Sequence, residues 1–577
     1  MNAKQGLEKA ASRSLLLNVK LIAGLFASLF RRGPFRTSRF ILGCIVVGFT
    51  EIVSIGMILP IVNDVIGEEA EDSFFSELSR GILSWFGLEP SIGSNLCLFL
   101  TVSFLSACIY LAVSHDRARY IFVHEVELKE GLFSKILGST WLSWSKMSHG
   151  DVINGLTRES DNTKLAFNHL LQFISQLILI LAFVGMLFYI DIELTFVAMI
   201  TSSLTFLVIG PILNYSKNIG ARVTLGAAHY SQIVINFCRG YKNVKVLSLA
   251  ELLRGRVSVA IGRVAGDTLI SNGFLVPFRV KFFEFLGMIS LCVLVYASME
   301  VTKTPHSKML HMIVVLLKLI PMISQALNHL AQIFGYIPAF HFIEEIERGA
   351  EVEEIHKGET ISQIQDISFR EVDFSYPGGK RVMGNFSHRF ERGRFYAICG
   401  ESGAGKTTLL DLIMGLMPIE EGRLEYNKVD AEKINIDSVR NRIGYLSQNS
   451  YIFEGSIREN IVWGMSDWTE ESLTRAVGVS QLSSLVEENG LDFRILESGQ
   501  NLSGGQMQRL ALARLLMRNY DFILLDEPTA SLDLETEASI LNSLVDLKGR
   551  VGVLAITHRE EFLRHADEVV TIESGNG

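Results

Sequence analysis

Six long apolar segments in the first 340 residues constrain the fold of this chain more than any other feature. They cover residues 41–65, 96–113, 170–190, 194–213, 274–297 and 309–333. Each is about as long as a helix that crosses a bilayer, and a segment in lipid must satisfy its backbone hydrogen bonds within itself. The sequence therefore predicts an all-α bundle with six membrane spans.

The charged residues between these segments indicate how the predicted bundle is oriented. Basic residues precede the first span and follow the second and the fourth, whereas the segment 68–94 between the first two spans is acidic. The positive-inside rule places basic loops in the cytoplasm. The N-terminus and the long polar stretches after spans two and four are expected there. Six spans return the chain to the cytoplasm near residue 340.

Composition narrows the class of protein further. A length of 577 residues suits two or three domains, and a formal net charge of −9 gives no indication of nucleic acid as a partner. The hydrophobic fraction of 48 % and the mean hydropathy of +0.30 reflect the spans. The six cysteines stand singly, mostly in apolar segments and without metal-ligand spacing, so we interpret them as small core residues.

The apolar stretch from Leu15 to Phe30 imitates a secretory signal peptide. However, Lys20 interrupts it, two arginines and Gly33–Pro34 follow, and no small-residue cleavage site is evident. We therefore favour an interfacial helix on the cytoplasmic side of the membrane.

A phosphate-binding motif follows an apolar strand in the second half of the chain. The predicted strand Phe395–Cys399 runs directly into Gly400, Glu401, Ser402, Gly403, Ala404, Gly405, Lys406, Thr407 and Thr408. This is the P-loop spacing in its strand-to-helix context. In such a loop the backbone N–H groups cradle phosphates, the lysine supplies a positive charge, and the first threonine hydroxyl is placed for Mg²⁺. ATP and Mg²⁺ are the expected cofactors.

More residues suited to ATP chemistry lie between positions 501 and 533. A predicted helix begins there, and its free N-terminal N–H groups would face an anion. The residues at its start are Ser503, Gly504, Gly505 and Gln506. The apolar strand Phe522–Leu525 then delivers Asp526 and Glu527 at its end. A later strand, Val553–Thr557, ends at His558.

In this order, the motifs resemble the nucleotide-binding domain of an ABC transporter. The resemblance covers residues 346–577, and the six spans ahead of it extend it to the exporter class of ABC proteins over the whole chain. It implies an ATP hydrolase coupled to transmembrane transport, with Glu527 as general base and Asp526 as a carboxylate for Mg²⁺. It also implies that Gln448 senses Mg²⁺ or the attacking water, that His558 contacts the γ-phosphate and that Tyr376 stacks on adenine.

Two positions depart slightly from the family pattern. Leu496 stands where a glycine often precedes Glu497, and the residues from Asp526 to Asp533 have an arrangement that is also common in importers. Neither departure removes a catalytic group, so hydrolysis is expected to be intact.

The resemblance also implies a second subunit. In the family fold, Ser503 and the glycines after it lie far from their own P-loop and complete the ATP site of another domain. Because this chain has one P-loop and one such signature, the simplest expectation is a homodimer with twelve spans and two shared ATP sites.

The predicted organisation has three parts. Residues 1–38 form the cytoplasmic N-terminus with its interfacial helix, residues 39–345 the six-span domain, and residues 346–577 an α/β P-loop NTPase domain. The helices that couple the two domains in this family would fall near Ser148–Leu156 and Tyr230–Tyr241. The expected location is the bacterial inner membrane, with the ATPase domain in the cytoplasm.

Charged residues within the spans are the candidates for substrate contact. Such residues are costly in lipid and tend to line pathways or to pair with each other. They are Glu51, Arg279, Lys281 and Lys318. In the first interpretation, they form a partly basic cavity for an anionic headgroup such as a pyrophosphate. In the alternative they pair within the bundle, and Lys281 and Glu284 have the spacing for this.

Short stretches of the spans resemble bacterial flippases for lipid-linked oligosaccharides. They are Glu51–Pro60 in the first span and Leu316–Pro321 in the sixth, and an apolar stripe from Phe74 to Phe86 matches that family's helix in the first outer loop. This stripe would lie on the outer membrane surface or pack on the bundle. The first hypothesis is a flippase or exporter of a lipid-linked or other amphipathic substrate. A peptide or protein exporter is the second, and a soluble ABC-type ATPase is contradicted by the spans.

Overall fold

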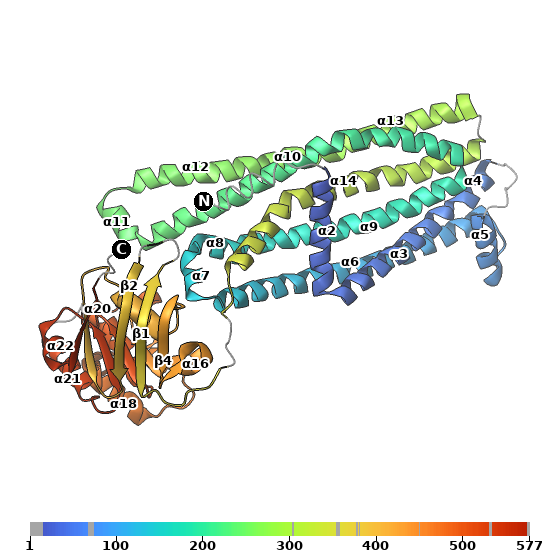
Figure 1. Cartoon of the computed structure of the whole chain (residues 1–577). Helices are drawn as coiled ribbons and strands as arrows, with labels where there is room; N and C mark the ends of the chain where they lie inside the picture. The colour runs from blue at the N-terminus through green and yellow to red at the C-terminus, as the bar shows by residue number, and fades with distance from the viewer. Residues whose placement is uncertain are drawn as a thin grey trace. The chain divides into compact units, whose positions relative to one another are not determined.

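Two units make up the computed structural model of this chain (Figure 1). It describes residues 15–66, 74–302, 305–353, 358–376, 379, 381–448, 450–529 and 534–573. The first unit consists of Met1–Ser139 and Ser143–Val352, and the second of Thr140–Leu142 and Glu353–Gly577. The sequence-based boundaries at residues 38 and 345 stay predictions.

The first unit is all-α in its described residues. Its helices are α2 (Leu15–Arg32), α3 (Pro34–Gly56), α4 (Ile58–Ile66), α5 (Phe74–Trp85), α6 (Ile92–Leu137), α7 (Trp141–Lys146), α8 (His149–Asn154), η1 (Gly155–Glu159), α9 (Ser160–Ile190), α10 (Ile192–Arg239), α11 (Tyr241–Val246), α12 (Ala250–Thr268), η2 (Leu269–Leu275), α13 (Val276–Ala297), η3 (Ser298–Thr302) and α14 (His306–Gly349). The three η segments of this unit are π-helices. Helix α14 packs on α9, α10 and α13, and α3 packs on α6 and α9.

Five helical stretches are long and apolar enough to cross a membrane, as far as the described side chains show. They are Pro34–Val62, Ile92–Leu137, His149–Ile190, Ala250–Glu300 and Lys308–Gly349. Four of them contain one predicted span each and run well beyond it, whereas Pro34–Val62 covers the predicted span 41–65 only as far as Val62. The predicted span 194–213 lies in α10, where the apolar helix Ile192–Thr201 is found and most side chains from 202 to 213 lie outside the described residues.

The helices of the first unit extend far past the predicted spans and then turn through short helices. Gly138 ends α6 and Gly240 ends α10, and the turning helices α7 and α11 follow. Of the expected coupling segments, Ser148–Leu156 lies at the start of the next long helix and Tyr230–Tyr241 mostly belongs to α10, and their coupling role stays a prediction.

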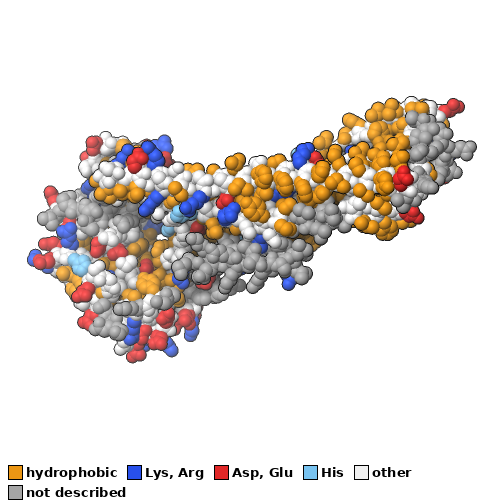
Figure 2. Space-filling view, turned by 90° about the horizontal axis from the view of Figure 1, so that it is seen from above, with side chains coloured by type: hydrophobic (Ala, Val, Ile, Leu, Met, Phe, Trp, Pro, Cys, Tyr) orange, Lys and Arg blue, Asp and Glu red, His pale blue; other side chains and the backbone are white. Residues whose placement is uncertain are grey.

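Hydrophobic side chains gather on the part of this unit farthest from α11, whereas charged side chains surround α11 and the start of α12 (Figure 2). This distribution fits a bundle that has one end in lipid and the other in water. Of the cysteines, Cys44 is buried and Cys399 half-buried, but Cys97, Cys108, Cys238 and Cys292 are exposed. The core interpretation was wrong for these four. Cys97, Cys108 and Cys292 lie in spans, which present apolar side chains to lipid as well as to neighbouring helices, and Cys238 lies beyond the predicted span near the end of α10.

The outer-loop helix α5 packs one face on the bundle. Phe75 is buried and meets the ring of Tyr189 edge-on at 6.1 Å, and Ser79 donates a hydrogen bond of 2.7 Å to Asn95. The opposite face leaves Phe74 and Trp85 exposed. The stripe in the sequence is thus a helix that is both docked and apolar on its outer side. The acidic residues Glu68, Glu69, Glu71 and Asp72 lie outside the described residues.

The second unit is α/β and contains two main sheets. Its strands are β1 (Asp366–Ser375), β2 (Arg381–Glu391), β3 (Phe395–Cys399), β4 (Glu421–Tyr426), β5 (Val429–Asp430), β6 (Ile443–Leu446), β7 (Gly455–Ser456), β8 (Arg494–Ile495), β9 (Phe522–Asp526), β10 (Gly552–Ile556) and β11 (Glu568–Thr571). A parallel sheet has the order β11-β3-β10-β9-β6, and an antiparallel sheet has the order β2-β1-β4-β5. The predicted strands before the P-loop, before Asp526 and before His558 are confirmed.

The helices of the second unit cover both faces of the parallel sheet. They are α15 (Lys406–Ile413), η4 (Ala431–Lys433), α16 (Ile436–Arg440), α17 (Ile457–Ile461), α18 (Glu470–Val479), α19 (Ser483–Asn489), η5 (Glu497–Gly499), α20 (Gly504–Leu516), α21 (Leu534–Val545) and α22 (Glu560–His565). Alternate strand residues face opposite sides, so Leu524 packs with α15 and Leu525 with α20.

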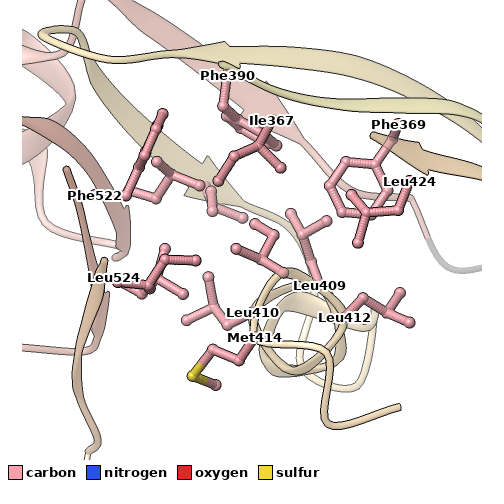
Figure 3. Packing of buried hydrophobic residues seen from close by; sticks show 14 of the residues in the cluster. Ile367, Phe369, Phe390, Leu409, Leu410, Leu412, Met414, Leu424, Phe522 and Leu524 are labelled. Atoms are coloured by element: carbon pink, nitrogen blue, oxygen red, sulfur yellow. The ribbon is translucent and has the colours of Figure 1, made fainter. Parts of the chain in front are cut away.

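Figure 3 shows how α15 is held between the two sheets. Leu409, Leu410 and Leu412 lie against Ile367, Phe369, Phe390 and Leu424 of the antiparallel sheet and against Phe522 and Leu524 of β9. This apolar packing fixes the helix that begins at the end of the P-loop.

Candidate functional site

The P-loop connects β3 to α15 through backbone conformations that favour glycine. Gly405 has φ +99° and Gly400 has φ +153°. A Cβ at Gly405 would lie 2.7 Å from Val382 Cγ1, and one at Gly400 would collide with the carbonyl oxygen of Ile572. Both positions therefore require glycine. The loop residues between them are Glu401, Ser402, Gly403 and Ala404, and the first three of these are exposed.

Lys406 and Thr407 begin α15, and their polar groups contact the P-loop and Asp526. The Lys406 ammonium donates to the carbonyl oxygens of Gly400 at 2.7 Å and Glu401 at 3.0 Å, so it lies across the loop. The Thr407 hydroxyl donates to Asp526 Oδ2 at 3.2 Å. The first turn of α15 thus carries the Lys406 cation and the Thr407 hydroxyl, which is hydrogen-bonded to the Asp526 carboxylate.

Glu527 and Gln448 are brought together at the carboxyl edge of the parallel sheet. Strands β6 and β9 are neighbours, and the Gln448 amide donates to Glu527 Oε2 at 2.8 Å. Glu527 has φ +51°, a conformation that a non-glycine residue rarely adopts. Its backbone N–H donates to the carbonyl oxygen of Ile556 at 3.1 Å, which fixes the turn. Gln448 is exposed and Glu527 is half-buried, so both remain within reach of a water molecule.

The carboxylate of Asp526 lies in a half-buried and crowded place. Burial raises its pKa, and the charge of Glu527 adds to this, while the hydrogen bond from Thr407 opposes both. A further carboxylate, Asp411, lies one turn after Thr407 on α15, and burial followed by the charge of Asp526 raises its pKa to about 6. A divalent cation bound between Thr407 and Asp526 would relieve this crowding of negative charge, and hard oxygen donors are what Mg²⁺ prefers.

Sequence reasoning missed Asp411 and Gln508. Asp411 is a single acid in the apolar run of α15, and Gln508 is 5 % exposed on α20 and donates to the carbonyl oxygen of Glu527 at 3.2 Å. The available signal was a polar residue at a position that the helix period assigns to the core.

His558 and Tyr376 reach the same region from other elements. His558 is exposed two residues after β10, whose last residue Ile556 pairs with Asp526. Tyr376 follows β1, and its hydroxyl is 3.0 Å from the Thr408 hydroxyl on α15. The structure thus places the Tyr376 ring beside the helix that begins at the P-loop, and its role toward adenine stays a prediction.

The signature residues lie on the other side of the parallel sheet from the P-loop helix. Ser503 caps α20: its hydroxyl accepts from Gln506 N at 3.2 Å, and Gln506 Oε1 accepts from Ser503 N at 2.8 Å. Gly504 is exposed and Gly505 half-buried. Helix α20 packs in the core with Leu525 and Val553, whereas α15 packs with Leu524 and Leu554. The helix start marked by Ser503 is therefore open to a group from outside this unit. Residues 530–533 lie outside the described part of the chain.

The four candidate substrate residues are in different environments. Glu51 accepts a long hydrogen bond of 3.4 Å from Ser106. Arg279 is 2 % exposed, and its guanidinium donates to Ser216 Oγ at 2.8 Å and Asn328 Oδ1 at 3.3 Å.

The other two candidates are exposed. Lys281 forms the ion pair with Glu284, at 2.9 Å, that its spacing allowed. Lys318 is exposed on α14. Lys281 is therefore exposed, unlike the buried Arg279, and already has a partner.

Comparisons with known proteins agree with this geometry. Residues 383–530 match the family model "ABC transporter". A solved bacterial Atm1-family ABC exporter with ATP bound superposes with a TM-score of 0.77 over 95 % of both chains, at 19 % identity. The chain is an ABC exporter by fold, with an ABC transporter ATPase domain fused to a transmembrane domain. An ABC transporter ATPase domain implies ATP hydrolysis coupled to transport.

Curated relatives differ in the substrates that their names suggest. The "Heterocyst differentiation ATP-binding protein HepA" of Nostoc sp. is 28 % identical over 78 % of this chain and 74 % of its own length. The "ATP-dependent lipid A-core flippase" of Escherichia coli is 24 % identical over 87 % of this chain and 86 % of its own. A "Multidrug resistance ABC transporter ATP-binding and permease protein" of Lactococcus lactis is 26 % identical over 75 % and 76 %. These relatives support a membrane exporter or flippase without fixing the substrate.

Proposed function

We propose that this ABC exporter flips or exports an amphipathic lipid with an anionic headgroup, in the first place a lipid-linked oligosaccharide. The observation that carries the proposal is Arg279. This cation is buried within a membrane bundle, and it donates hydrogen bonds to the neutral side chains of Ser216 and Asn328. Within the described residues, no carboxylate forms an ion pair with it. A buried charge without a counter-charge is costly, and an anionic headgroup would supply that counter-charge.

The ATP site works through the residues assembled at the carboxyl edge of the sheet. Lys406 and the P-loop N–H groups would hold phosphate oxygens, while Thr407 and Asp526 would provide oxygen ligands for Mg²⁺. When bound, ATP would supply the phosphoanhydride bond and Mg²⁺ would neutralise part of the phosphate charge. Glu527 takes the proton of the attacking water, and Gln448, hydrogen-bonded to Glu527 at 2.8 Å, orients that carboxylate. His558 holds the γ-phosphate side of the site.

The working unit in this proposal is a homodimer in a bacterial inner membrane, with the ATPase units in the cytoplasm. Ser503 and the N-terminus of α20 then face the P-loop of the second copy. The exposed helix start at Gly504, on the opposite side of the sheet from α15, supports this arrangement.

The test of the substrate is purification in mild detergent followed by mass spectrometry of co-purified lipid. We expect a diphosphate-linked lipid that also stimulates ATP hydrolysis by the reconstituted protein. Recovery of a peptide whose addition stimulates hydrolysis would support the alternative, a peptide or protein exporter, and would overturn the lipid proposal.

Neutralising the intramembrane cations tests the role of Arg279 separately. In Arg279→Gln with Lys318→Gln, transport should fall at least about tenfold, the cost of one lost charge-assisted hydrogen bond, and fall more than basal ATP hydrolysis. Lys281→Gln is the matched control, since Lys281 is exposed and paired with Glu284. Equal losses of transport and hydrolysis would mean that Arg279 and Lys318 support the fold and not the substrate.

A further inference from the structure

Five polar residues line the contact between α9 and α14, and we refer to them together as the α9–α14 seam. They are His169, Gln176, Gln325, His329 and Tyr336. On α14 the spacing of four and then seven residues places its three members on one face, and on α9 the spacing of seven does the same for two. Helices α9 and α14 both belong to stretches long enough to cross a membrane.

The two helices touch through side chains that are 149 or 160 residues apart in the sequence. His169 Nδ1 is 3.1 Å from His329 Nδ1, and the Gln176 amide donates to Gln325 Oε1 at 3.1 Å. The ring of Tyr336 is stacked on that of His169, with centroids 5.9 Å apart and planes 6° from parallel. The seam is thus ordered by contacts across the helix pair.

These contacts leave part of the hydrogen-bonding capacity of the seam unused. Gln176 Oε1 is buried and has no hydrogen-bond partner. Among the described residues, no hydrogen bond involves the Gln325 amide nitrogen or the Tyr336 hydroxyl either. A purely structural polar contact in a membrane bundle is expected to satisfy its own donors and acceptors, because water is scarce there. The seam therefore has acceptors and donors left for a ligand.

The chemistry of these groups indicates what kind of ligand fits. Amide and phenol groups donate and accept hydrogen bonds without charge, and the stacked rings present flat apolar faces. Together they match a molecule with many hydroxyl groups and apolar C–H faces. The seam is also continuous with the proposed anion site, because Asn328, which binds Arg279, directly precedes His329.

We propose that the α9–α14 seam binds the carbohydrate part of a lipid-linked substrate, next to the phosphate site at Arg279. This inference rests on the proposed function and deepens it, because it assigns the sugar and the phosphate to different residues. Bound sugar hydroxyls donate to Gln176 Oε1 and accept from the Gln325 amide and the Tyr336 hydroxyl, and the sugar ring lies on the Tyr336 face.

The experiment compares two probes on the reconstituted full-length protein: a prenyl diphosphate that carries an oligosaccharide and the same prenyl diphosphate without sugar. The wild type should need about tenfold less of the glycosylated probe for half-maximal stimulation of ATP hydrolysis, as expected when a site rejects an analogue that leaves its polar groups unpaired. Gln176→Leu with Gln325→Leu should abolish this preference while still responding to the sugar-free probe.

The control and a milder variant keep the result interpretable. Ser54→Ala with Ser103→Ala removes a hydrogen bond of 2.7 Å between α3 and α6, away from the seam, and should keep the preference of the wild type. Tyr336→Phe removes one hydroxyl without changing the ring. The ratio of half-maximal concentrations of the two probes should therefore fall to roughly the square root of its wild-type value. Tyr336→Phe provides the same test of the seam if the variant with both glutamines replaced by leucine does not fold.

The outcomes separate this inference from the proposed function. If neither probe stimulates the wild type, the lipid-linked substrate is wrong and the seam proposal fails with it. If both probes stimulate the wild type equally, the proposed lipid diphosphate substrate is supported, but the proposal that the seam binds sugar is wrong. If the wild type prefers the glycosylated probe and the seam variants retain that preference, the seam is a structural contact only.

Discussion

At the scale of single residues, the Gln448–Glu527 pair allows a test of the proposed general base. Glu527→Gln should lower the ATP hydrolysis rate by at least about 100-fold, the usual contribution of a general base, while ATP binding is retained. Phosphate release measures the first quantity and nucleotide retention on the purified protein the second.

The control for Glu527→Gln is Glu471→Gln, since Glu471 is exposed on α18 and makes one long ion pair of 3.8 Å with Arg475. It should keep wild-type turnover. Normal turnover in Glu527→Gln itself would refute the assignment of the base.

His388 gives the second unit a dependence of stability on pH. It lies on β2 among aromatic rings, 4.5 Å from the centroid of Phe390, and its Nε2 is buried without a hydrogen bond. Burial lowers its pKa from the ordinary value of 6.5, against the opposing effect of Glu568. The unfolded chain therefore takes up a proton before the folded chain does, and stability is lost as the pH falls below about 6.5.

His388→Phe should remove this part of the acid sensitivity, because phenylalanine cannot take up a proton. Thermal unfolding of wild type and variant between about pH 8 and pH 5.5 measures it, and the difference between their melting temperatures should grow in favour of the variant toward acid. Parallel profiles would show that His388 titrates alike in both states.

Residues of the ATP site were predictable where the signal is local. The P-loop, Asp526 with Glu527, and His558 each follow an apolar strand within a few positions, and parallel strands bring their carboxyl ends to one edge. Asp411 and Gln508 were not predictable, because each is one polar residue in an apolar helix and its partner comes from a different element. The His169–His329 contact joins residues 160 positions apart, and only the packing of α9 on α14 creates it.

At the scale of elements, the docking of α5 depends on a glycine. A Cβ at Gly56, the last residue of α3, would collide with the ring of Phe75. Gly56→Ala should therefore destabilise the protein by about 1–3 kcal/mol, as overpacking of a filled site does. Thermal unfolding in detergent measures the change.

Gly81→Ala is the matched control, because Gly81 lies on α5 itself and a Cβ there meets nothing within 4 Å. Alanine is the better helix former, so this variant should be neutral or slightly stabilising. Equal destabilisation by the two variants would show that the Gly56–Phe75 approach is not the cause.

Element types were predicted more reliably than their ends. Hydropathy marks the part of a helix in lipid, so it locates the span 96–113 but not the end of α6 at Leu137. The polar continuation has no hydropathy signal, and its end at Gly138 became clear only with the turn into α7.

At the scale of the whole molecule, the separation of the P-loop and the signature by the parallel sheet allows a test of the proposed homodimer. In a mixed dimer with Lys406→Ala in one copy and Ser503→Arg in the other, both defects fall in one shared site and the second site stays intact. With both changes in the same copy, each site has one defect.

The first arrangement should therefore retain ATP hydrolysis from one site, and the second should lose it by at least about tenfold relative to the first. Dimers purified with two different affinity tags provide the measurement. Equal activity of the two arrangements would exclude shared sites.

The π-helix η1 sets which side of α9 faces α14. The helix from α8 through η1 to α9 is continuous, and η1 widens its winding at Gly155–Glu159. Each residue of an α-helix turns the next by about 100°, so a chain lacking one of those five residues would rotate the rest of α9 by that angle. Leu170 and Leu177 would then take the places of His169 and Gln176. The face of α9 that contacts α14 thus depends on the helical register at η1, which ends ten residues before His169. A single-residue deletion there would replace a polar contact between the two helices by an apolar one.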